Sequence, residues 1–362
     1  MSTSSQPVRF CASHDGTRIA IATDGSGPPL VRAAHWLSHL DYERTCPLWG
    51  PWLTLLARRH TLIRYDGRGC GLSERDASDF SLDRGVEDLE AVVDSSGLDR
   101  FALFGATIGG MTALAYAARH PDRVSHLILV GGLAVGRMAR DPPALIEDTG
   151  IELKAIELGW GNDDPAFRQL FTSLFIPDAT AEQTRSLNEL MRVASSPQIA
   201  IKRLQPFQRV DLRALATQVR CPALVFHSQR DARIPVEQGR ALAALIPDAR
   251  FVALDSRNHW VVDTEPAWAQ FAAEIDGFLP GVPDTSVPSE AAGRDALTPR
   301  ELQVIELLAG GLDNVAIGAR LGISAKTVRN RVSTIVDKLG VTTRPQAIAW
   351  ARDGGLGRKP AS

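Results

Sequence analysis

A short glycine-rich turn, GATIGG at positions 105–110, joins an apolar run to a segment with helical periodicity. The apolar run, 101–104, has the length of a buried strand, and residues 111–119 continue as a helix. Glycines at a strand-to-helix turn leave no Cβ atoms between the two backbones, which can then pack closely. The turn therefore predicts a sheet covered by helices, with Thr107 at the tip of one strand-to-helix connection.

The rest of residues 1–279 continues this alternation. Short apolar or β-branched runs alternate with helical stretches, which is the β-α-β pattern of a mostly parallel sheet. The strand-like runs include 62–65, 101–104, 127–130, 223–226 and 251–254. Between about 137 and 208 the strands stop and the chain becomes helical and aromatic. We therefore expect an α/β fold with a helical cap at about 137–208.

A segment at 280–295, PGVPDTSVPSEAAGRD, contains three prolines, two glycines and no apolar periodicity. These features are typical of an exposed linker between domains. A chain of 362 residues has room for one domain of about 250 to 280 residues and a small second one. We predict a first domain at 1–279, the linker at 280–295 and a small all-α domain at 296–362.

Charge is distributed unevenly between these two parts. Residues 294–362 carry 11 Lys and Arg against 6 Asp and Glu, which leaves 29 against 36 for the first 293 residues. The tail therefore has a net charge of +5 and the body one of −7. A basic module on an acidic body points to nucleic acid as a partner of the tail.

Composition excludes several other classes of protein. Hydrophobic residues make up 44% and charged residues 23%, as in ordinary globular chains. The start is polar and no run approaches the roughly 20 apolar residues that span a bilayer, so we expect a cytoplasmic protein without a membrane partner. The cysteines have no CxxC spacing, so we expect reduced thiols, no metal site and no cofactor.

The turn at 105–110 has the context of a nucleophile elbow, in which a nucleophilic side chain stands at the tip. The residue at that position is Thr107 rather than serine. Asp231 follows the strand-like run that ends near residue 226, and His259 follows the one that ends near residue 254. Nucleophile, acid and histidine thus come in the chain order of α/β-hydrolases.

Over about residues 7–279 the chain resembles the α/β-hydrolase family. Besides the elbow, residues 66–73 (DGRGCGLS) are similar to the family's DxRGxGxS turn, and residues 118–124 (ARHPDRV) match a further family segment. The resemblance implies that Asp231 orients His259 and that His259 acts as general base on the residue at the elbow.

The resemblance also implies an oxyanion hole. The backbone N–H of Ile108 would supply one half, and the loop at His35 and Trp36 the other. The family usually has His-Gly where this chain has His35-Trp36, so we expect an indole to occlude or reshape this loop.

Thr107 is the second departure from the family pattern. A β-branched residue is disfavoured in the strained backbone of an elbow by roughly 1–3 kcal/mol, and its methyl group restricts χ1. Both departures favour a domain that senses a ligand over an efficient enzyme, with Thr107 contacting the ligand. The alternative is slow esterase or lactonase activity through a Thr-His-Asp triad, and a plain packing role for Thr107 also remains open.

Aromatic side chains are the candidates to line a pocket for a small, largely apolar ligand. They are His35, Trp160, Phe167, Phe171, Phe175 and Phe207. Phe167, Phe171 and Phe175 recur at a spacing of four, which is also the pattern of ordinary packing between a cap and a core. Both interpretations remain open.

The tail carries start and stop signals for successive helices. Thr298 and Glu301 form a capping box at the start of the first helix. Asp313 is placed to cap the second helix and Gly322 to close it, after which Ser324 caps the third. A fourth short helix is expected from about residue 343.

In the third helix, an apolar stripe at every third or fourth residue from Val328 predicts a buried face, and the outward face is basic and polar. Residues 297–301 (LTPRE), 311–314 (GLDN), 323–330 (ISAKTVRN) and 338–341 (KLGV) together resemble the LuxR-type helix-turn-helix.

That resemblance, over residues 296–354, implies that the third helix enters the major groove of DNA. Arg329, Asn330 and Ser333 would then lie near base edges, and Lys326, Thr327 and Arg331 near phosphates. It also implies a homodimer formed through the fourth helix. The sequence thus predicts a DNA-binding transcription regulator whose α/β-hydrolase-like domain senses a small ligand, with RNA polymerase as a further candidate partner.

Overall fold

The computed structural model describes residues 7–140, 143–279, 297–338, 347–348 and 351. The chain divides into two compact units, Met1–Gly281 and Val282–Ser362. The expected linker at 280–295 lies outside the described residues. No helix in the described part is long and apolar enough to cross a membrane.

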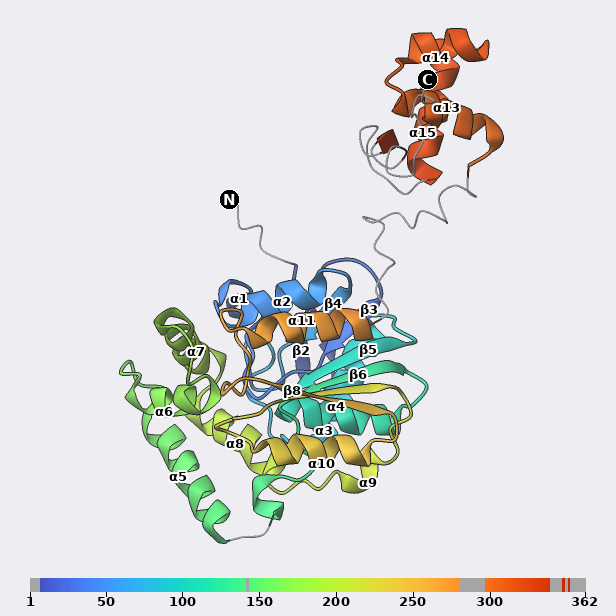
Figure 1. Ribbon diagram of the computed structural model, residues 1–362. Helices are drawn as coiled ribbons and strands as arrows, with labels where there is room; N and C mark the ends of the chain where they lie inside the picture. Colours follow the sequence, from blue (N-terminus) through green and yellow to red (C-terminus); the bar gives the residue numbers. More distant parts are fainter. Residues whose placement is uncertain (1–6, 141–142, 280–296, 339–346, 349–350, 352–362) are drawn as a thin grey trace. The chain divides into compact units, whose positions relative to one another are not determined.

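The first unit is built on an eight-stranded sheet (Figure 1). Its strands are β1 (Arg9–Ala12), β2 (Arg18–Asp24), β3 (Pro29–Arg32), β4 (Thr61–Tyr65), β5 (Phe101–Ala106), β6 (Val124–Val130), β7 (Ala223–Ser228) and β8 (Ala249–Leu254). Their order is β1-β2-β4-β3-β5-β6-β7-β8. The β1–β2 and β2–β4 pairs are antiparallel, and all later pairs are parallel. The expected α/β fold is therefore confirmed.

Helices cover both faces of this sheet (Figure 1). One face carries α1 (Leu40–Thr45), α2 (Trp49–Ala57) and α11 (Ala267–Phe278), and the other α3 (Leu82–Ser95), α4 (Ile108–Arg119), α9 (Arg213–Ala216) and α10 (Val236–Leu245). The α2 and α11 helices meet through aromatic rings, with the centroids of Trp52 and Phe271 4.7 Å apart. Both side chains are almost fully buried, so these helices close one side of the core.

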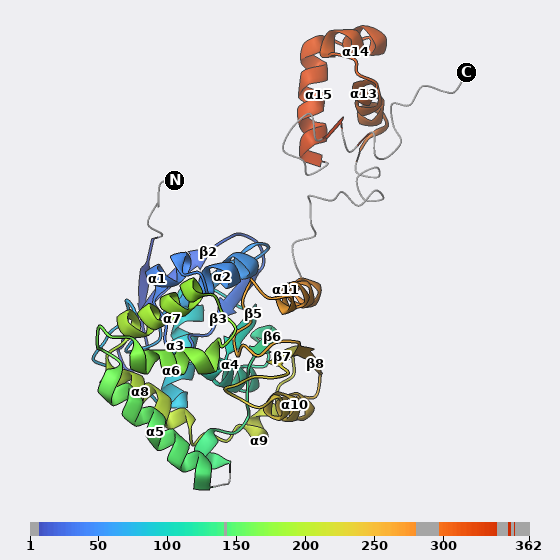
Figure 2. The same ribbon diagram turned by 60° about the vertical axis from the view of Figure 1, so that its left-hand side comes forward.

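Between β6 and β7 the chain forms the helical cap of the expected fold. It consists of the short 3₁₀ helix η1 (Arg137–Ala139) and the helices α5 (Pro143–Gly159), α6 (Ala166–Phe175), α7 (Ala181–Ala194) and α8 (Pro197–Phe207). Figures 1 and 2 show α5 to α8 grouped together at one end of the sheet. The Trp36 indole, from the loop after β3, donates a hydrogen bond to the Ala200 carbonyl of α8 at 3.0 Å. This contact ties the cap to the sheet.

The turn between β5 and α4 is as tight as its glycines predict. A Cβ atom on Gly105 would lie 2.5 Å from the carbonyl oxygen of Gly109, and one on Gly109 would lie 2.9 Å from that of Ala33. Between them Thr107 has φ 50° and ψ −113°, and it is the one non-glycine residue with positive φ in the described part of the chain. The close approach of strand and helix thus requires a strained backbone at Thr107.

The second unit contains α13 (Pro299–Ala309), α14 (Asn314–Leu321) and α15 (Ala325–Lys338). Each predicted cap is present. Thr298 and Glu301 form the capping box, Asp313 accepts from the Ala316 N–H at 2.8 Å, and Gly322 closes α14 with φ 67°. The Ser324 hydroxyl accepts from the backbone N–H of Thr327, the third residue of α15, at 3.1 Å.

The predicted apolar stripe of α15 is buried as far as the structure describes it. Val328, Val332 and Ile335 all lie in the core of the second unit. Leu339 and the expected start of the fourth helix lie outside the described residues. Ala347, within the expected fourth helix, also lies in this core. The helix-turn-helix therefore packs as the sequence predicts.

The tight turn leads to a prediction about stability. Gly105→Ala should lower the free energy of unfolding by about 1–3 kcal/mol or more, because its Cβ has no room beside the Gly109 carbonyl. Gly277→Ala is the matched control. Gly277 lies inside α11 with open space around it, so alanine should raise the free energy of unfolding by about 0.5–1 kcal/mol. Urea unfolding of the full chain, followed by tryptophan fluorescence, measures both. Equal stability of the two variants would contradict the steric role of Gly105.

Candidate functional site

Three residues from separate loops meet at the carboxyl ends of the parallel strands. The hydroxyl oxygen of Thr107, after β5, lies 2.7 Å from Nε2 of His259, which follows β8. Nδ1 of His259 lies 2.6 Å from a carboxylate oxygen of Asp231, which follows β7. We refer to Thr107, His259 and Asp231 as the triad. The structure thus places in one hydrogen-bonded chain the three residues whose order in the sequence suggested a common site.

The protonation of this chain follows from Asp231. Burial alone would raise the pKa of its carboxyl, but the imidazoles of His259 and His227 outweigh burial and hold the pKa well below its usual value. The carboxylate can therefore only accept, and Nδ1–H of His259 donates to it. Nε2 is then free to accept from the Thr107 hydroxyl, as a general base requires.

Neighbouring backbone holds the acid and the base in place. Asp231 also accepts from the backbone N–H groups of Arg233, at 2.7 Å, and Ile234, at 3.0 Å. The backbone N–H of His259 donates to the carbonyl of Phe175, at the end of cap helix α6, at 2.8 Å. Gly131, directly after β6, leaves the room that the imidazole occupies, since a Cβ there would lie 2.4 Å from its Cε1. The geometry of the triad thus depends on both the sheet and the cap.

A second donor occupies the Thr107 hydroxyl. The indole N–H of Trp260 donates to Thr107 Oγ1 at 3.2 Å, so this oxygen accepts from Trp260 while it donates to His259. A hydrogen bond donated to a nucleophile withdraws electron density from the lone pair that would attack a carbonyl. The Thr107 hydroxyl is therefore held between two partners, on a strained and β-branched residue.

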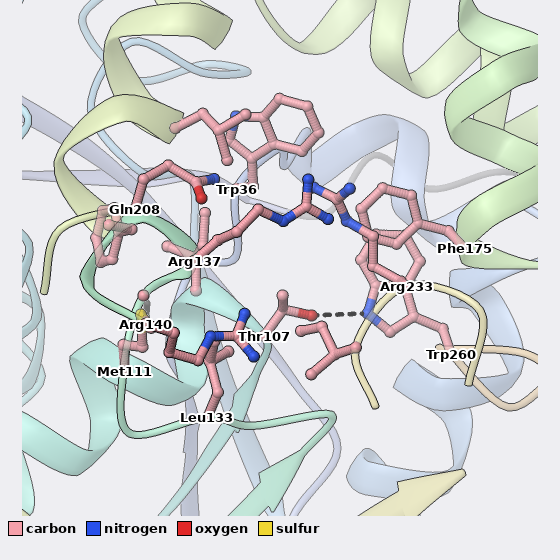
Figure 3. Close-up of a pocket in the computed structure, with 15 residues that line it drawn as sticks. Trp36, Thr107, Met111, Leu133, Arg137, Arg140, Phe175, Gln208, Arg233 and Trp260 are labelled. Atoms are coloured by element: carbon pink, nitrogen blue, oxygen red, sulfur yellow. Dashed lines mark hydrogen bonds between the residues drawn. The ribbon is translucent and has the colours of Figure 1, made fainter. Parts of the chain in front are cut away.

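A cavity opens beside Thr107, and Figure 3 shows the side chains around it. Its empty volume is about 620 Å³, including the part open to solvent. The apolar lining side chains are Trp36, Ile108, Met111, Leu133, Phe175, Leu204, Phe207, Ile234 and Trp260. The polar ones are Thr107, Arg137, Arg140, Gln208 and Arg233. The cavity therefore combines an apolar wall with several guanidinium groups.

Of the aromatic candidates, Phe175 and Phe207 line this cavity, and so do Trp36 and Ile108 of the expected oxyanion hole. Ile108 is the first residue of α4. The Trp36 ring lies against the cap, 6.4 Å from the Phe175 ring between centroids. The indole therefore forms part of the cavity wall.

The remaining candidates do not line the cavity, and the pocket interpretation is corrected for them. Trp160 and Phe171 are buried inside the cap, with ring centroids 5.5 Å apart. Phe167 is 42% exposed on the outside of the cap. Because a four-residue spacing turns gradually around a helix, only Phe175, at the end of α6, reaches the cavity.

His35 is also buried behind the site rather than within it. Its Nε2 lies 2.9 Å from a carboxylate oxygen of Glu43, and its ring stacks on Trp49 at 4.7 Å. Burial lowers the pKa of His35 to about 4. Glu43 also binds the Arg32 guanidinium at 2.8 Å. His35 therefore stabilises the loop that carries Trp36, and it does not contact the cavity.

Sequence reasoning missed several residues of the site. Trp260 directly follows His259 in the sequence, so its closeness to the triad had a local signal. Arg137, Arg140 and Arg233 had none, because their meeting depends on how the cap folds over the sheet. No group of three or more His, Cys, Asp and Glu side chains in the described part of the chain could hold a metal ion.

The candidate DNA-binding residues lie on α15. Lys326 and Arg329 are exposed, and Thr327 and Arg331 are partly exposed. The Thr327 hydroxyl lies 2.8 Å from that of Ser324, so it also takes part in the cap of this helix. The side chains of the two other candidates, Asn330 and Ser333, lie outside the described part of the structure. An exposed pair of cations thus marks one face of the helix.

The fold and the triad define an α/β-hydrolase. Comparison with known families agrees: residues 42–266 match the alpha/beta hydrolase fold family, and residues 295–351 match the bacterial regulatory proteins of the luxR family. The chain belongs to the α/β-hydrolase family and carries a C-terminal LuxR-type DNA-binding domain.

Similar proteins include hydrolases of several kinds. A putative carbamate hydrolase RutD from Azorhizobium caulinodans is 32% identical over 65% of this chain and 85% of its own length. A pimeloyl-[acyl-carrier protein] methyl ester esterase from Chromobacterium violaceum is 31% identical over 43% of this chain and 61% of its own length. The structure of an enol-lactonase from Burkholderia xenovorans is 23% identical and superposes with a TM-score of 0.62. The match covers 75% of this chain and 99% of the enol-lactonase chain, and it shows that the two share a fold.

The site geometry predicts how Thr107 limits reactivity. Hydrolysis of 4-nitrophenyl butyrate by the wild type should be very slow, and Thr107→Ser should raise it by about tenfold or more. The reason is that serine keeps the hydroxyl beside His259 but removes the methyl group, which restricts χ1 and so limits how the hydroxyl can face both His259 and a carbonyl. Absorbance of released 4-nitrophenolate measures the rate.

Two controls separate this effect from adventitious hydrolysis. Thr107→Ala removes the nucleophile, and His259→Ala in the Thr107→Ser background removes the base; each should abolish the activity. A serine variant no faster than the wild type would show that Thr107 is not what limits reactivity.

Proposed function

We propose that this protein is a transcription regulator in which the α/β-hydrolase domain binds a small ligand and thereby changes DNA binding by the LuxR-type domain. The observation that carries the proposal is the state of Thr107. Its backbone is strained and its hydroxyl is held between His259 and Trp260. This arrangement favours holding a ligand in the cavity over converting it rapidly.

The names of similar proteins support a class of ligand. They describe hydrolases that act on a carbamate, a methyl ester and an enol-lactone. A cavity related to these would suit a small molecule with a carbonyl group. The apolar wall formed by Trp36, Phe175 and Phe207 would contact the body of such a ligand.

A second candidate function is slow hydrolysis of the ligand by the same site. The hydrogen-bond distances within the triad favour it, since base and acid are in contact with the hydroxyl. A slow wild-type rate in the ester assay that is lost in both Thr107→Ala and His259→Ala would favour this second function over binding alone. Turnover on the order of 10 per second, lost in both Thr107→Ala and His259→Ala, would replace the sensor with a true Thr-His-Asp hydrolase.

For the second unit we propose that α15 enters the major groove as one half of a homodimer. Lys326 and Arg331 would contact phosphates together with Thr327, and Arg329 would reach base edges together with Asn330 and Ser333. The dimer would bind two half-sites and would contact RNA polymerase from the operator. The exposed side chains of Lys326 and Arg329 support the proposal that α15 enters the major groove.

Two substitutions on α15 should affect DNA binding differently. Arg329→Ala should weaken binding to the operator by about 1–3 kcal/mol and relax its sequence preference, since an arginine that reads a guanine carries sequence information. Lys326→Ala should weaken binding evenly across sequences and reduce its salt dependence. Fluorescence anisotropy with operator and scrambled duplexes measures both. Wild-type affinity and selectivity in both variants would contradict this recognition face.

The two domains should act on each other. A fragment of residues 293–362 should bind operator DNA more weakly than the full chain, because the fourth helix alone then holds the dimer. A ligand of the cavity should change the affinity of the full chain for DNA but not that of the fragment. Anisotropy titrations with and without ligand test this. Equal affinities for both proteins under all conditions would show that the body does not regulate the tail.

A further inference from the structure

Three arginines reach the cavity from two parts of the chain. Arg137 and Arg140 lie in and just after η1, and Arg233 lies in the loop after β7 (Figure 3). Glu152, on cap helix α5, pairs with two of them. It lies 3.0 Å from Arg137, and its second oxygen lies 3.1 Å from Arg233. One buried carboxylate thus serves two guanidinium groups.

Among the described residues, no carboxylate pairs with the third guanidinium group, that of Arg140. Nε of Arg140 is shielded from solvent and has no hydrogen-bond partner among the described residues. Burial and the positive charge of Arg137 both lower the pKa of Arg140. A shielded cationic donor without an acceptor is unfavourable, and a group that accepts its hydrogen bonds would remove that penalty. Figure 3 shows the Arg140 side chain extending towards Thr107.

The charges around the cavity determine what kind of group fits. Glu152 is the carboxylate bound to this arginine cluster, and Asp231 is the carboxylate bound to His259. The pKa of each carboxyl group is lowered, so both are charged. Counted over the described residues, these two carboxylates leave one positive charge of the three guanidinium groups unbalanced. A monoanion would neutralise it, whereas a phosphate dianion would leave an excess of negative charge.

We propose that the ligand of this cavity is a small organic carboxylate, whose carboxylate binds Arg140 and whose apolar body lies against Trp36, Phe175 and Phe207. The proposal rests on the ligand-binding function proposed above and names the class of ligand. It also refines the expected largely apolar ligand into an amphipathic one. A guanidinium matches a carboxylate through paired hydrogen bonds, which is why a lysine at this position would serve less well.

The test compares hexanoate with hexanamide, which has the same body but no charge. Binding to the full chain is followed by isothermal titration calorimetry and by the change in total tryptophan fluorescence, to which Trp36 and Trp260 of the cavity wall contribute, at fixed pH and ionic strength. The wild type should bind hexanoate about tenfold more tightly than hexanamide, the effect of one charge-assisted hydrogen bond. Arg140→Gln should reduce this preference to about twofold or less, and Arg140→Lys should keep part of it.

Arg230→Gln is the matched control, because Arg230 is an exposed arginine paired with Asp255 on the surface. It should keep the full preference for hexanoate. Three outcomes would overturn the proposal: no binding of hexanoate by the wild type, equal binding of acid and amide, or a preference that survives Arg140→Gln. Tighter binding of hexyl phosphate than of hexanoate would also overturn it in favour of a phosphate.

The proposed carboxylate site and the proposed regulation of DNA binding can fail independently of each other. If hexanoate binds through Arg140 but leaves DNA affinity unchanged, the carboxylate site stands and the proposed regulation by this ligand fails. Circular dichroism of Arg140→Gln checks that the variant is folded, which we expect because the substitution removes a shielded Nε donor that has no partner among the described residues.

Discussion

The close approach of strand β5 to helix α4 is the constraint on which the site depends. Gly105 and Gly109 are needed because the two backbones leave no room for side chains. The chain can reverse within so short a distance only by passing through positive φ, and Thr107 occupies that position. The strain is offset by the burial of the whole sheet around it. The turn also directs the Thr107 hydroxyl towards His259, at the edge of the sheet where loops from other strands meet.

The cap completes what the sheet begins. Phe175, at the end of α6, accepts the backbone N–H of His259 and stacks on Trp260, with ring centroids 4.4 Å apart. The same side chain lines the cavity. A ligand that moves Phe175 would therefore also move the base and the second donor to Thr107. In the proposed sensor, Phe175 would therefore couple occupation of the cavity to the position of His259, and a ligand that contacts Phe175 differently in two states would shift the equilibrium between them.

Local signals account for what the sequence could predict. The caps at Thr298 and Asp313 depend on residues three positions apart, and the triad depends on the order of strands and loops, so both were visible without coordinates. The fold class followed from the alternation of strands and helices. The cavity lining did not follow. The spacing of Phe167 and Phe171 does not show what either side chain contacts. Arg140 reaches the cavity only because the cap folds back over the sheet.

Slow chemistry is compatible with regulation for a simple kinetic reason. A hydrolase that turns over about 10 times per second destroys a bound ligand within roughly a tenth of a second. A regulator needs the bound state to last long enough to shift the equilibrium with DNA, so rapid turnover would erase the signal. The Trp260 indole on Thr107 Oγ1, the β-branched methyl group and the strained backbone each act against attack on a carbonyl. None of them closes the cavity, and Arg140 remains available to hold an anion. The features that disfavour attack on a carbonyl are therefore the ones that the proposed regulator would need in order to retain a carboxylate long enough to affect DNA binding.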